Sequence, residues 1–348
     1  MRTLVIGGGL SGLAVAHGLQ GRGQDHTLVE ARDRFGGRIL TEPFGGAAFD
    51  LGPAWFWPGQ PRIAALTDRL GLQRFDQYAQ GDLIYEDAQG QVQRGRGFAS
   101  MQGSWRLVGG LDALIQTLVQ GLSPQDLRLN AAVTALAQTD AGIVATLATG
   151  DRLHADRVVL AMPPRLVADI RFLPALPGAA TATLQSVTTW MAGQAKALAV
   201  YDRPFWRDAG LSGDATSRRG PMVEVHDASP ATGGPFALFG FIGVPPEGRS
   251  DVPALRHHLI AQLVRMFGPQ AATPAQLFVK DWATDPFTAT QADRKPVHAH
   301  PAYGMPRPLT ALWGGTLILA GTEVAAEFGG YLEGALESAE AALLTMRV

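Results

Sequence analysis

Apolar and polar positions at the start of the chain predict a compact strand–helix–strand unit. Residues 3–6 form a short, continuous apolar run, which is typical of a strand buried in a parallel sheet. Residues 10–19 carry apolar side chains at helical spacing, and residues 26–29 read as a second strand. The unit spans about 30 residues, the size of a βαβ element that binds a dinucleotide.

The rest of the chain predicts two interleaved parts. Further helices are expected at 61–70, 111–122, 255–267 and 331–346, and strands at 82–94 (a hairpin), 127–133, 143–148, 157–160, 193–202, within 211–244, and at 316–320. Strands alternate with helices near both ends and follow one another in the middle. This order predicts an α/β fold, with a doubly wound, Rossmann-like dinucleotide-binding domain (an FAD-binding domain, once the motifs below are considered) and an interleaved mixed-sheet α+β substrate domain.

The expected domain boundaries follow from that order. The nucleotide domain is predicted to be discontinuous, with segments 1–53, 106–172 and 285–348. The substrate domain is predicted to comprise 54–105 and 173–284. Each part is long enough to bury a core of its own.

Composition narrows the partners. The 348 residues are 46% hydrophobic and carry a net charge of −2, so we expect no nucleic-acid partner. No apolar run approaches the ~18 residues of a membrane span, and a strand beginning at Thr3 leaves no room for a signal peptide, so we expect no membrane contact and a cytoplasmic location. The histidine pairs 257–258 and 298/300 lack acidic partners at metal-ligand spacing, so we expect no metal.

The turn after the first strand carries Gly7-x-Gly9-x-x-Gly12. Gly7 permits the tight turn, Gly9 lets the backbone approach a pyrophosphate, and Gly12 lets the helix pack on the strand. An acid at the end of the second strand, Glu30, is placed to accept hydrogen bonds from a ribose. The expected cofactor contacts of this unit are Gly7, Gly9, Leu10, Ser11, Gly12, Glu30, Ala31 and Arg32.

Two further turns point to the same ligand. Gly36 and Gly37 precede Arg38, which predicts a close-approach loop with a phosphate donor. Near the C-terminus a buried strand is followed by a turn and then by a helix that begins at a double glycine, where the helix N-terminus could face a flavin ring. The contacts expected there are Gly321, Glu323, Gly330, Tyr331 and Leu332.

Lys196 is the position expected to carry chemistry. Only three lysines occur, and this one lies in an apolar strand, where period-2 alternation places it on one face with Leu198 and Val200. Burial on that face would lower its pKa.

Taken together, these motifs resemble those of the flavin-containing amine oxidases, the monoamine and polyamine oxidase group. The run Glu-Ala-Arg-Asp-Arg-x-Gly-Gly-Arg from residue 30, Asp50-Leu51-Gly52, Pro163-Pro164, Pro204-Phe205-Trp206 after the lysine, and the C-terminal turn all occur in that family's order. The resemblance implies FAD, with Gly52, Pro53 and Ala54 along it, Val133 near the adenine, and Glu323 and Leu332 near the ribityl chain and ring. It also implies that Lys196 binds a water below flavin N5, and that Tyr331 and Trp282 lie beside the ring.

The resemblance implies the reaction as well. An amine is expected to lose a hydride to N5 and become an imine, with O2 as acceptor and H2O2 as product. The chain has no cysteine, which excludes a thioether-linked flavin, so FAD is expected to be non-covalent. Two alternatives stay open: another flavin oxidoreductase on the same scaffold (a desaturase, or a renalase-like oxidase of reduced nicotinamide isomers), and a non-catalytic flavin-loaded binding protein.

The sequence also departs from the family. Gln291 and Ala292 stand where a second aromatic residue is expected, so Trp55, Phe56, Trp57 or Tyr303 would have to complete an aromatic cage. The segment between residues 52 and 109 is short, which predicts a reduced lid and an open site.

Overall fold

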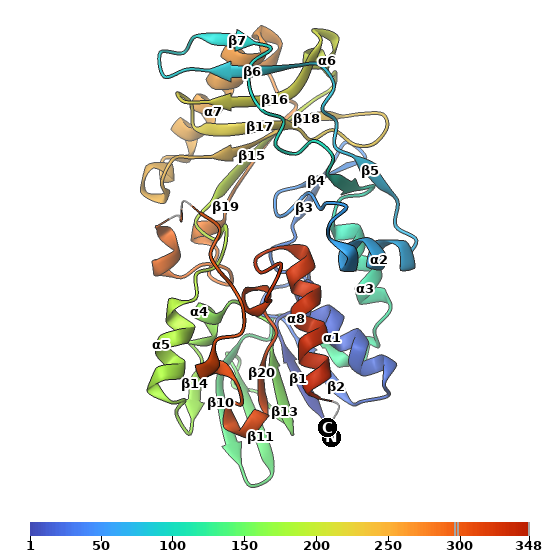
Figure 1. The fold of residues 1–348 in the computed structure, drawn as a ribbon, viewed down its shortest axis with the longest axis vertical. Coiled ribbons are helices and arrows are strands. Elements are labelled where there is room, and N and C mark those ends of the chain that lie inside the picture. Colours follow the sequence, from blue (N-terminus) through green and yellow to red (C-terminus); the bar gives the residue numbers. More distant parts are fainter. Residues whose placement is uncertain (296, 298, 347–348) are drawn as a thin grey trace.

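A five-stranded parallel sheet forms one end of the molecule (Figure 1). Its strands run in the order β20-β13-β1-β2-β9, so segments from the start, middle and end of the chain lie side by side. Their bounds are β1 Thr3–Ile6, β2 His26–Val29, β9 Leu127–Arg128, β13 Arg157–Leu160 and β20 Leu317–Leu319. The figure shows a computed structural model that describes residues 1–295, 297 and 299–346.

Each face of this sheet buries a separate core. Val5 contributes to a core formed with α1 (Leu10–Gly21), α3 (Asp112–Gln120) and α8 (Leu332–Thr345). Leu4 and Ile6, which point the other way, pack against a four-stranded sheet and two helices. That second layer comprises β12 (Arg152–Ala155), β11 (Gly142–Leu147), β10 (Val133–Thr139), β14 (Arg171–Leu173), α4 (Pro164–Val167) and α5 (Gly178–Ser186). The predicted α/β fold is confirmed.

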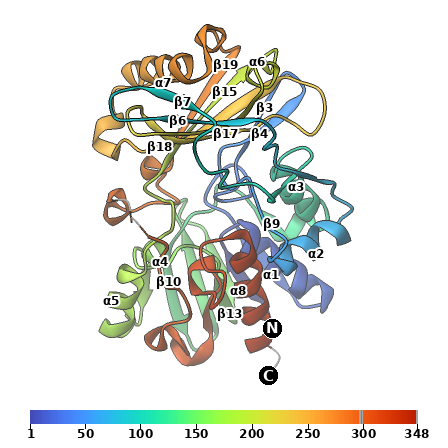
Figure 2. The same ribbon diagram turned by 45° about the horizontal axis from the view of Figure 1, so that its top comes forward.

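A seven-stranded mixed sheet forms the other end of the molecule (Figure 2). In spatial order it comprises β19 (Gln276–Asp281), β15 (Ala195–Tyr201), β18 (Phe236–Ile242), β17 (Met222–Asp227), β16 (Leu211–Ser217), β6 (Asp82–Glu86) and β7 (Val92–Arg94). Helix α7 (Val252–Phe267) covers the outer face, where it packs against the alanines of β15. Leu198 and Val200 of β15 point to the inner face, as the period-2 pattern predicts.

Smaller elements lie between the two sheets. They are the hairpin β3 (Thr41–Phe44) and β4 (Ala47–Asp50), the pair β5 (Arg74–Asp76) and β8 (Trp105–Leu107), and the helix α2 (Pro61–Arg69). The short helix α6 (Phe205–Asp208) joins β15 to β16 within the seven-stranded sheet. Single 3₁₀ turns occur at Pro124–Asp126, Pro246–Arg249, Pro269–Ala272, Trp282–Thr284, Gln291–Arg294, Arg307–Leu309, Trp313–Gly315 and Thr322–Val324. The domain boundaries expected from the sequence stay a prediction.

The strand predicted at 127–133 is wrong in its second half. β9 ends at Arg128, and Asn130 adopts a left-handed conformation with φ 55°. The chain then crosses the end of β2, where the N–H of Asn130 donates to the carbonyl of Arg32 (2.8 Å) and the N–H of Ala131 to that of Glu30 (2.8 Å). An Asn tolerates this conformation better than most residues, and the crossing brings residues 131–134 to the cavity described below.

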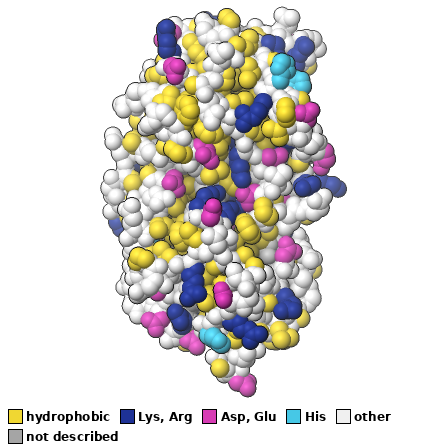
Figure 3. Space-filling model, turned by 180° about the vertical axis from the view of Figure 1, so that it is seen from behind, with side chains coloured by type: hydrophobic (Ala, Val, Ile, Leu, Met, Phe, Trp, Pro, Cys, Tyr) yellow, Lys and Arg dark blue, Asp and Glu magenta, His cyan; other side chains and the backbone are white. Residues whose placement is uncertain are grey.

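On the face seen in Figure 3, acidic and basic side chains are interspersed, in keeping with the net charge of −2. Among the described residues, no helix combines the length and the apolar character needed to cross a bilayer.

Candidate active site

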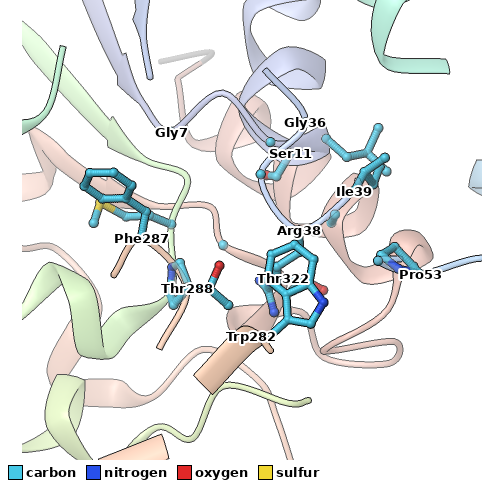
Figure 4. A pocket seen from close by; sticks show the side chains of 18 of the residues that line it. Gly7, Ser11, Gly36, Arg38, Ile39, Pro53, Trp282, Phe287, Thr288 and Thr322 are labelled. Atoms are coloured by element: carbon cyan, nitrogen blue, oxygen red, sulfur yellow. The ribbon is translucent and has the colours of Figure 1, made fainter. Parts of the chain in front are cut away.

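A cavity of about 880 Å³ lies between the two sheets. Its lining residues come from nearly the whole length of the chain, from Ile6 to Ala335. The predicted residues that line it are Gly7, Gly9, Leu10, Ser11, Glu30, Ala31, Arg32, Gly36, Gly37, Arg38, Gly52, Pro53, Ala54, Val133, Lys196, Trp282, Gly321, Gly330, Tyr331 and Leu332. Gly12 and Glu323 lie behind the wall and do not line the cavity. Figure 4 shows Ser11, Arg38 and Trp282 around the same space.

The N-terminus of α1 presents bare backbone to the cavity. Its N-cap residue is Gly9, and no side chain caps the first turn, so the N–H groups there are free to meet a ligand. A Cβ built on Gly9 would lie 3.8 Å from the carbonyl oxygen of Gly36 and 3.9 Å from Cα of Gly37, so the glycine loop packs directly against this turn. This surface therefore fits an anion that approaches the backbone closely, such as a pyrophosphate.

Gly12 has a different role, because it packs the helix on the strand. A Cβ at Gly12 would lie 1.9 Å from the carbonyl oxygen of Gly7 and 3.3 Å from Cβ of Ala161. Gly7 itself has φ 108°, a conformation that favours glycine. The two residues fix where the helix N-terminus lies.

The Glu30 carboxylate is buried at the end of β2. Its Oε2 accepts a hydrogen bond from the N–H of Gly8 (2.7 Å) and its Oε1 one from the N–H of Arg32 (2.9 Å). Arg32 reaches on to Asp285, with 2.5 Å between Nη2 and Oδ1, and to the hydroxyl of Thr288 (2.9 Å). Burial would raise the Asp285 pKa, but the charge of Arg32 and the hydrogen bond and charge of Lys280 outweigh it and lower the pKa.

Arg34, rather than Arg38, holds the glycine loop in shape. It donates to the carbonyls of Phe35, Ile39 and Gly37 at 2.9–3.1 Å. Arg38 lines the cavity and forms an ion pair with Glu323, 2.7 Å between Nη1 and Oε1. Glu323 is fully buried, and its oxygens make no directed hydrogen bond within the described residues. The ion pair with the Arg38 guanidinium is therefore its main polar contact.

Lys196 lies on the inner face of β15, as predicted, and is buried. Its Nζ donates to the carbonyl of Gly52 and sits 5.3 Å and 5.1 Å from the ring centroids of Phe239 and Phe241. Desolvation in this setting lowers the pKa of Lys196 to about 8, and Asp50 opposes that shift through its charge. The lysine is therefore a cation whose proton is easily removed, held at the cavity wall.

Trp282, in the turn that follows β19, and Tyr331, the N-cap residue of α8, both line the cavity. The indole N–H of Trp282 donates to the carbonyl of Leu51 (3.0 Å), which fixes the ring. Tyr331 is 38% exposed, and His300 stacks on it with 5.0 Å between centroids and 12° between planes. His300 also makes an edge-on contact with Trp190, and Trp190 lines the cavity. His298, grouped with His300 in the sequence, lies outside the described residues.

The candidates for a second cage aromatic divide clearly. Trp55 and Trp57 line the cavity. Phe56 is fully buried against Trp105, and the Tyr303 hydroxyl is engaged with Thr188 and the N–H of Trp190 behind the wall. Among the described residues no group of acids and histidines could hold a metal ion.

Trp190, Phe241 and Glu224 are among the cavity residues that sequence reasoning missed. Trp190 lies in a loop before β15, where no pattern marks it. Glu224 and His226 lie two residues apart in β17 and share one face, which marks that face as polar, but the spacing alone does not show the bulge that brings Glu224 to the cavity.

The match to known proteins covers nearly the whole chain. A family model described as flavin containing amine oxidoreductase matches residues 10–97 and 78–342. The putative flavin-containing monoamine oxidase AofH of Mycobacterium tuberculosis is 26% identical over 98% of this chain and 95% of its own length. That alignment spans 446 positions against 348 residues here, so the relative has segments without a counterpart in this chain.

One further sequence comparison and two structural comparisons involve other amine oxidases. Putrescine oxidase of Kocuria rosea is 24% identical over 82% of this chain and 83% of its own. A solved structure of putrescine oxidase bound to putrescine superposes with a TM-score of 0.83 at 20% identity, covering 99% of each chain. Cyclohexylamine oxidase from Brevibacterium oxydans also gives 0.83 at 20% identity, over 99% of this chain and 98% of that one.

Proposed function

Because the chain belongs to the flavin-containing amine oxidoreductase family, we propose that it oxidises an amine C–N bond to an imine with non-covalent FAD, and that O2 is the final acceptor, giving H2O2. The observation that carries this proposal is one continuous cavity that joins a bare helix N-terminus to Lys196, Trp282 and Tyr331. When bound, FAD would supply an acceptor for the hydride of the substrate carbon and a two-electron donor to O2.

The residues present fit FAD. Gly9 and the uncapped start of α1 would hold the pyrophosphate, and Glu30 would accept a hydrogen bond from a ribose hydroxyl. A 2′-phosphate beside the buried Glu30 carboxylate would be repelled. The far wall, with Lys196 and Trp282, would meet the ring. No cysteine is available for a thioether, which supports non-covalent binding.

The walls around the reacting end favour a neutral amine. Trp55, Phe241 and Tyr331 offer apolar surface, and an ammonium placed among them would lose its hydration. Lys196 adds a like charge and opposes an ammonium further. A neutral amine can yield a hydride from its α-carbon without a protein base, so the residues mainly bind and orient the substrate.

Glu224 argues against the nicotinamide alternative. It is a carboxylate on the cavity wall, and it would repel the phosphates of a reduced nicotinamide dinucleotide while attracting a cationic substrate. Amine oxidation is therefore favoured over the renalase-like oxidation of reduced nicotinamide isomers.

The direct experiment is anaerobic reduction of the flavin by a panel of monoamines, diamines and reduced nicotinamides. We expect amines to bleach the flavin absorbance, and to release H2O2 in air. Bleaching by nicotinamides alone would overturn the amine proposal, and no reduction by any member of the panel would favour a flavin-loaded binding protein.

Replacing Glu30 by Gln should raise the Kd for FAD by about 10-fold or more. Each Glu30 oxygen accepts a hydrogen bond from a backbone N–H, and the glutamine amide can accept only one of the two. The ribose therefore loses its charged acceptor, and the loop after β2 loses one of its hydrogen bonds. Titration of the apoprotein with FAD, followed by flavin fluorescence, measures the change.

Asp33→Asn is the matched control, because Asp33 is exposed in the same loop. An equal Kd for Glu30→Gln and wild type would contradict a ribose-binding role.

A further inference from the structure

Three polar residues form a chain on the inner face of the seven-stranded sheet. Nδ1 of His226 lies 2.7 Å from Oδ1 of Asp214 on β16, and Nε2 of His226 lies 3.0 Å from Oε1 of Glu224. Asp214 is 3% exposed and His226 1% exposed, whereas Glu224 reaches the cavity. This hydrogen-bonded series thus runs from a buried carboxylate, through an imidazole, to a carboxylate on the cavity wall.

A β-bulge aims Glu224 into the cavity. The register of β17 against β18 shifts between Met222 and Glu224, which makes Val223 the extra residue. Oε1 of Glu224 accepts from both His226 and the hydroxyl of Ser100. Within the described part of the chain no hydrogen bond is made to Oε2, so one oxygen is held from behind and the other is available to a ligand.

His226 and Glu224 each favour the charged state of the other. Burial would lower the His226 pKa, but the hydrogen bonds to Asp214 and Glu224, together with their charges, outweigh burial and raise it. Burial would raise the Glu224 pKa, but the bonds from His226 and Ser100 and the His226 charge lower it. Asp214 and Glu224 are the titratable groups in contact with His226, and Lys196 lies beyond Phe239 and Phe241.

The sheet sets the distance from Glu224 to the reacting end. In register, Glu224 pairs with Phe241 of β18, and Phe241 pairs with Lys196 of β15. Two strand spacings separate the backbones of the acid and the lysine by roughly 10 Å. The carboxylate therefore faces the end of the substrate away from the bond that is oxidised.

We propose that His226, anchored by Asp214, is a positioning residue that holds the Glu224 carboxylate ready for a second, positively charged group on the substrate. This inference rests on the proposed amine oxidation, and it makes diamines and longer polyamines the favoured class. The imidazole acts through Glu224 and does not touch the substrate itself.

The test compares 1,4-diaminobutane with butylamine, which has the same carbon chain and one amine. In His226→Leu, Glu224 loses a charged donor, so we expect KM for the diamine to rise about 10- to 100-fold. kcat should stay within about 2-fold for both amines, because the walls at the reacting end are unchanged. His226→Gln should recover part of the diamine preference, since its amide can still donate to Glu224, and Asp214→Asn should weaken that preference without changing the residue's shape.

Tyr201→Phe is the matched control. Tyr201 lies on β15 of the same sheet, and its hydroxyl donates to the carbonyl of Ala271 (3.1 Å). The substitution therefore removes a buried hydrogen bond at a residue that does not line the cavity. Equal loss for diamine and monoamine in His226→Leu, or an unchanged diamine preference in folded His226→Leu, His226→Gln and Asp214→Asn, would overturn the positioning role. If no amine reduces the wild-type flavin, the proposed function itself falls, and this inference with it.

Discussion

Lys196→Met is expected to slow aerobic turnover by about 100-fold, the scale of losing one preorganised electrostatic group in a dry site. Nζ of Lys196 is the buried cation beside the cavity, and methionine keeps most of the side-chain volume without the charge. Anaerobic reduction by substrate should change much less. Stopped-flow mixing of the reduced protein with O2 measures the oxidative step separately from the reductive one.

Lys280→Met is the matched control for this variant. Lys280 lies directly opposite Lys196 in register on β19, but its Nζ pairs with Asp285 (3.0 Å) and does not line the cavity. We expect reoxidation within about 3-fold of wild type, because the Lys280 ammonium is paired with Asp285 and does not reach the cavity. If Lys196→Met and wild type reoxidise at the same rate, the lysine has no part in the oxygen reaction.

Gly12→Ala is expected to leave most of the purified protein without flavin. The added methyl would lie 1.9 Å from the carbonyl oxygen of Gly7, so α1 has to move off β1 and its N-terminus with it. Overpacking of this kind costs about 1–3 kcal/mol or more, and a lower Tm should accompany the flavin loss. The ratio of flavin to protein absorbance and a thermal melt measure both effects.

Gly21→Ala provides the comparison within the same helix. Its Cβ would meet nothing within 4 Å, and alanine favours a helix over glycine by about 1 kcal/mol. We expect full flavin content and an equal or higher Tm. A Gly12→Ala protein with wild-type flavin content would show that the helix does not need this close approach.

The elements of the nucleotide-binding unit could be predicted because each is decided locally. β1 and β2 match the predicted ranges, because each is a short run with apolar residues that lies next to the helix of the same unit in the sequence. The strand expected at 127–133 failed where a non-local event took over, the crossing at Asn130 that hydrogen-bonds to Arg32. A pairing with a residue about 100 positions away leaves no local periodicity to read.

The candidate site divides in the same way. The predicted Lys196, Trp282 and Tyr331 all reach the cavity, because glycine turns and strand alternation place them. Trp190 reaches it only because a loop folds against His300 and Tyr303, which depends on tertiary packing. Glu224 depends on a one-residue bulge, and the alternation alone does not reveal a shift of register.

The strand order of the parallel sheet also bears on how the protein is made. β20 completes the sheet beside β13, and the cavity wall from Gly321 to Ala335 follows it in the chain. During synthesis the glycine turn at Gly7 emerges first but has no opposite wall until nearly the whole chain has left the ribosome. Capture of the cofactor is therefore a late event, and a chain truncated before residue 317 would emerge without a closed site however well its first strands fold.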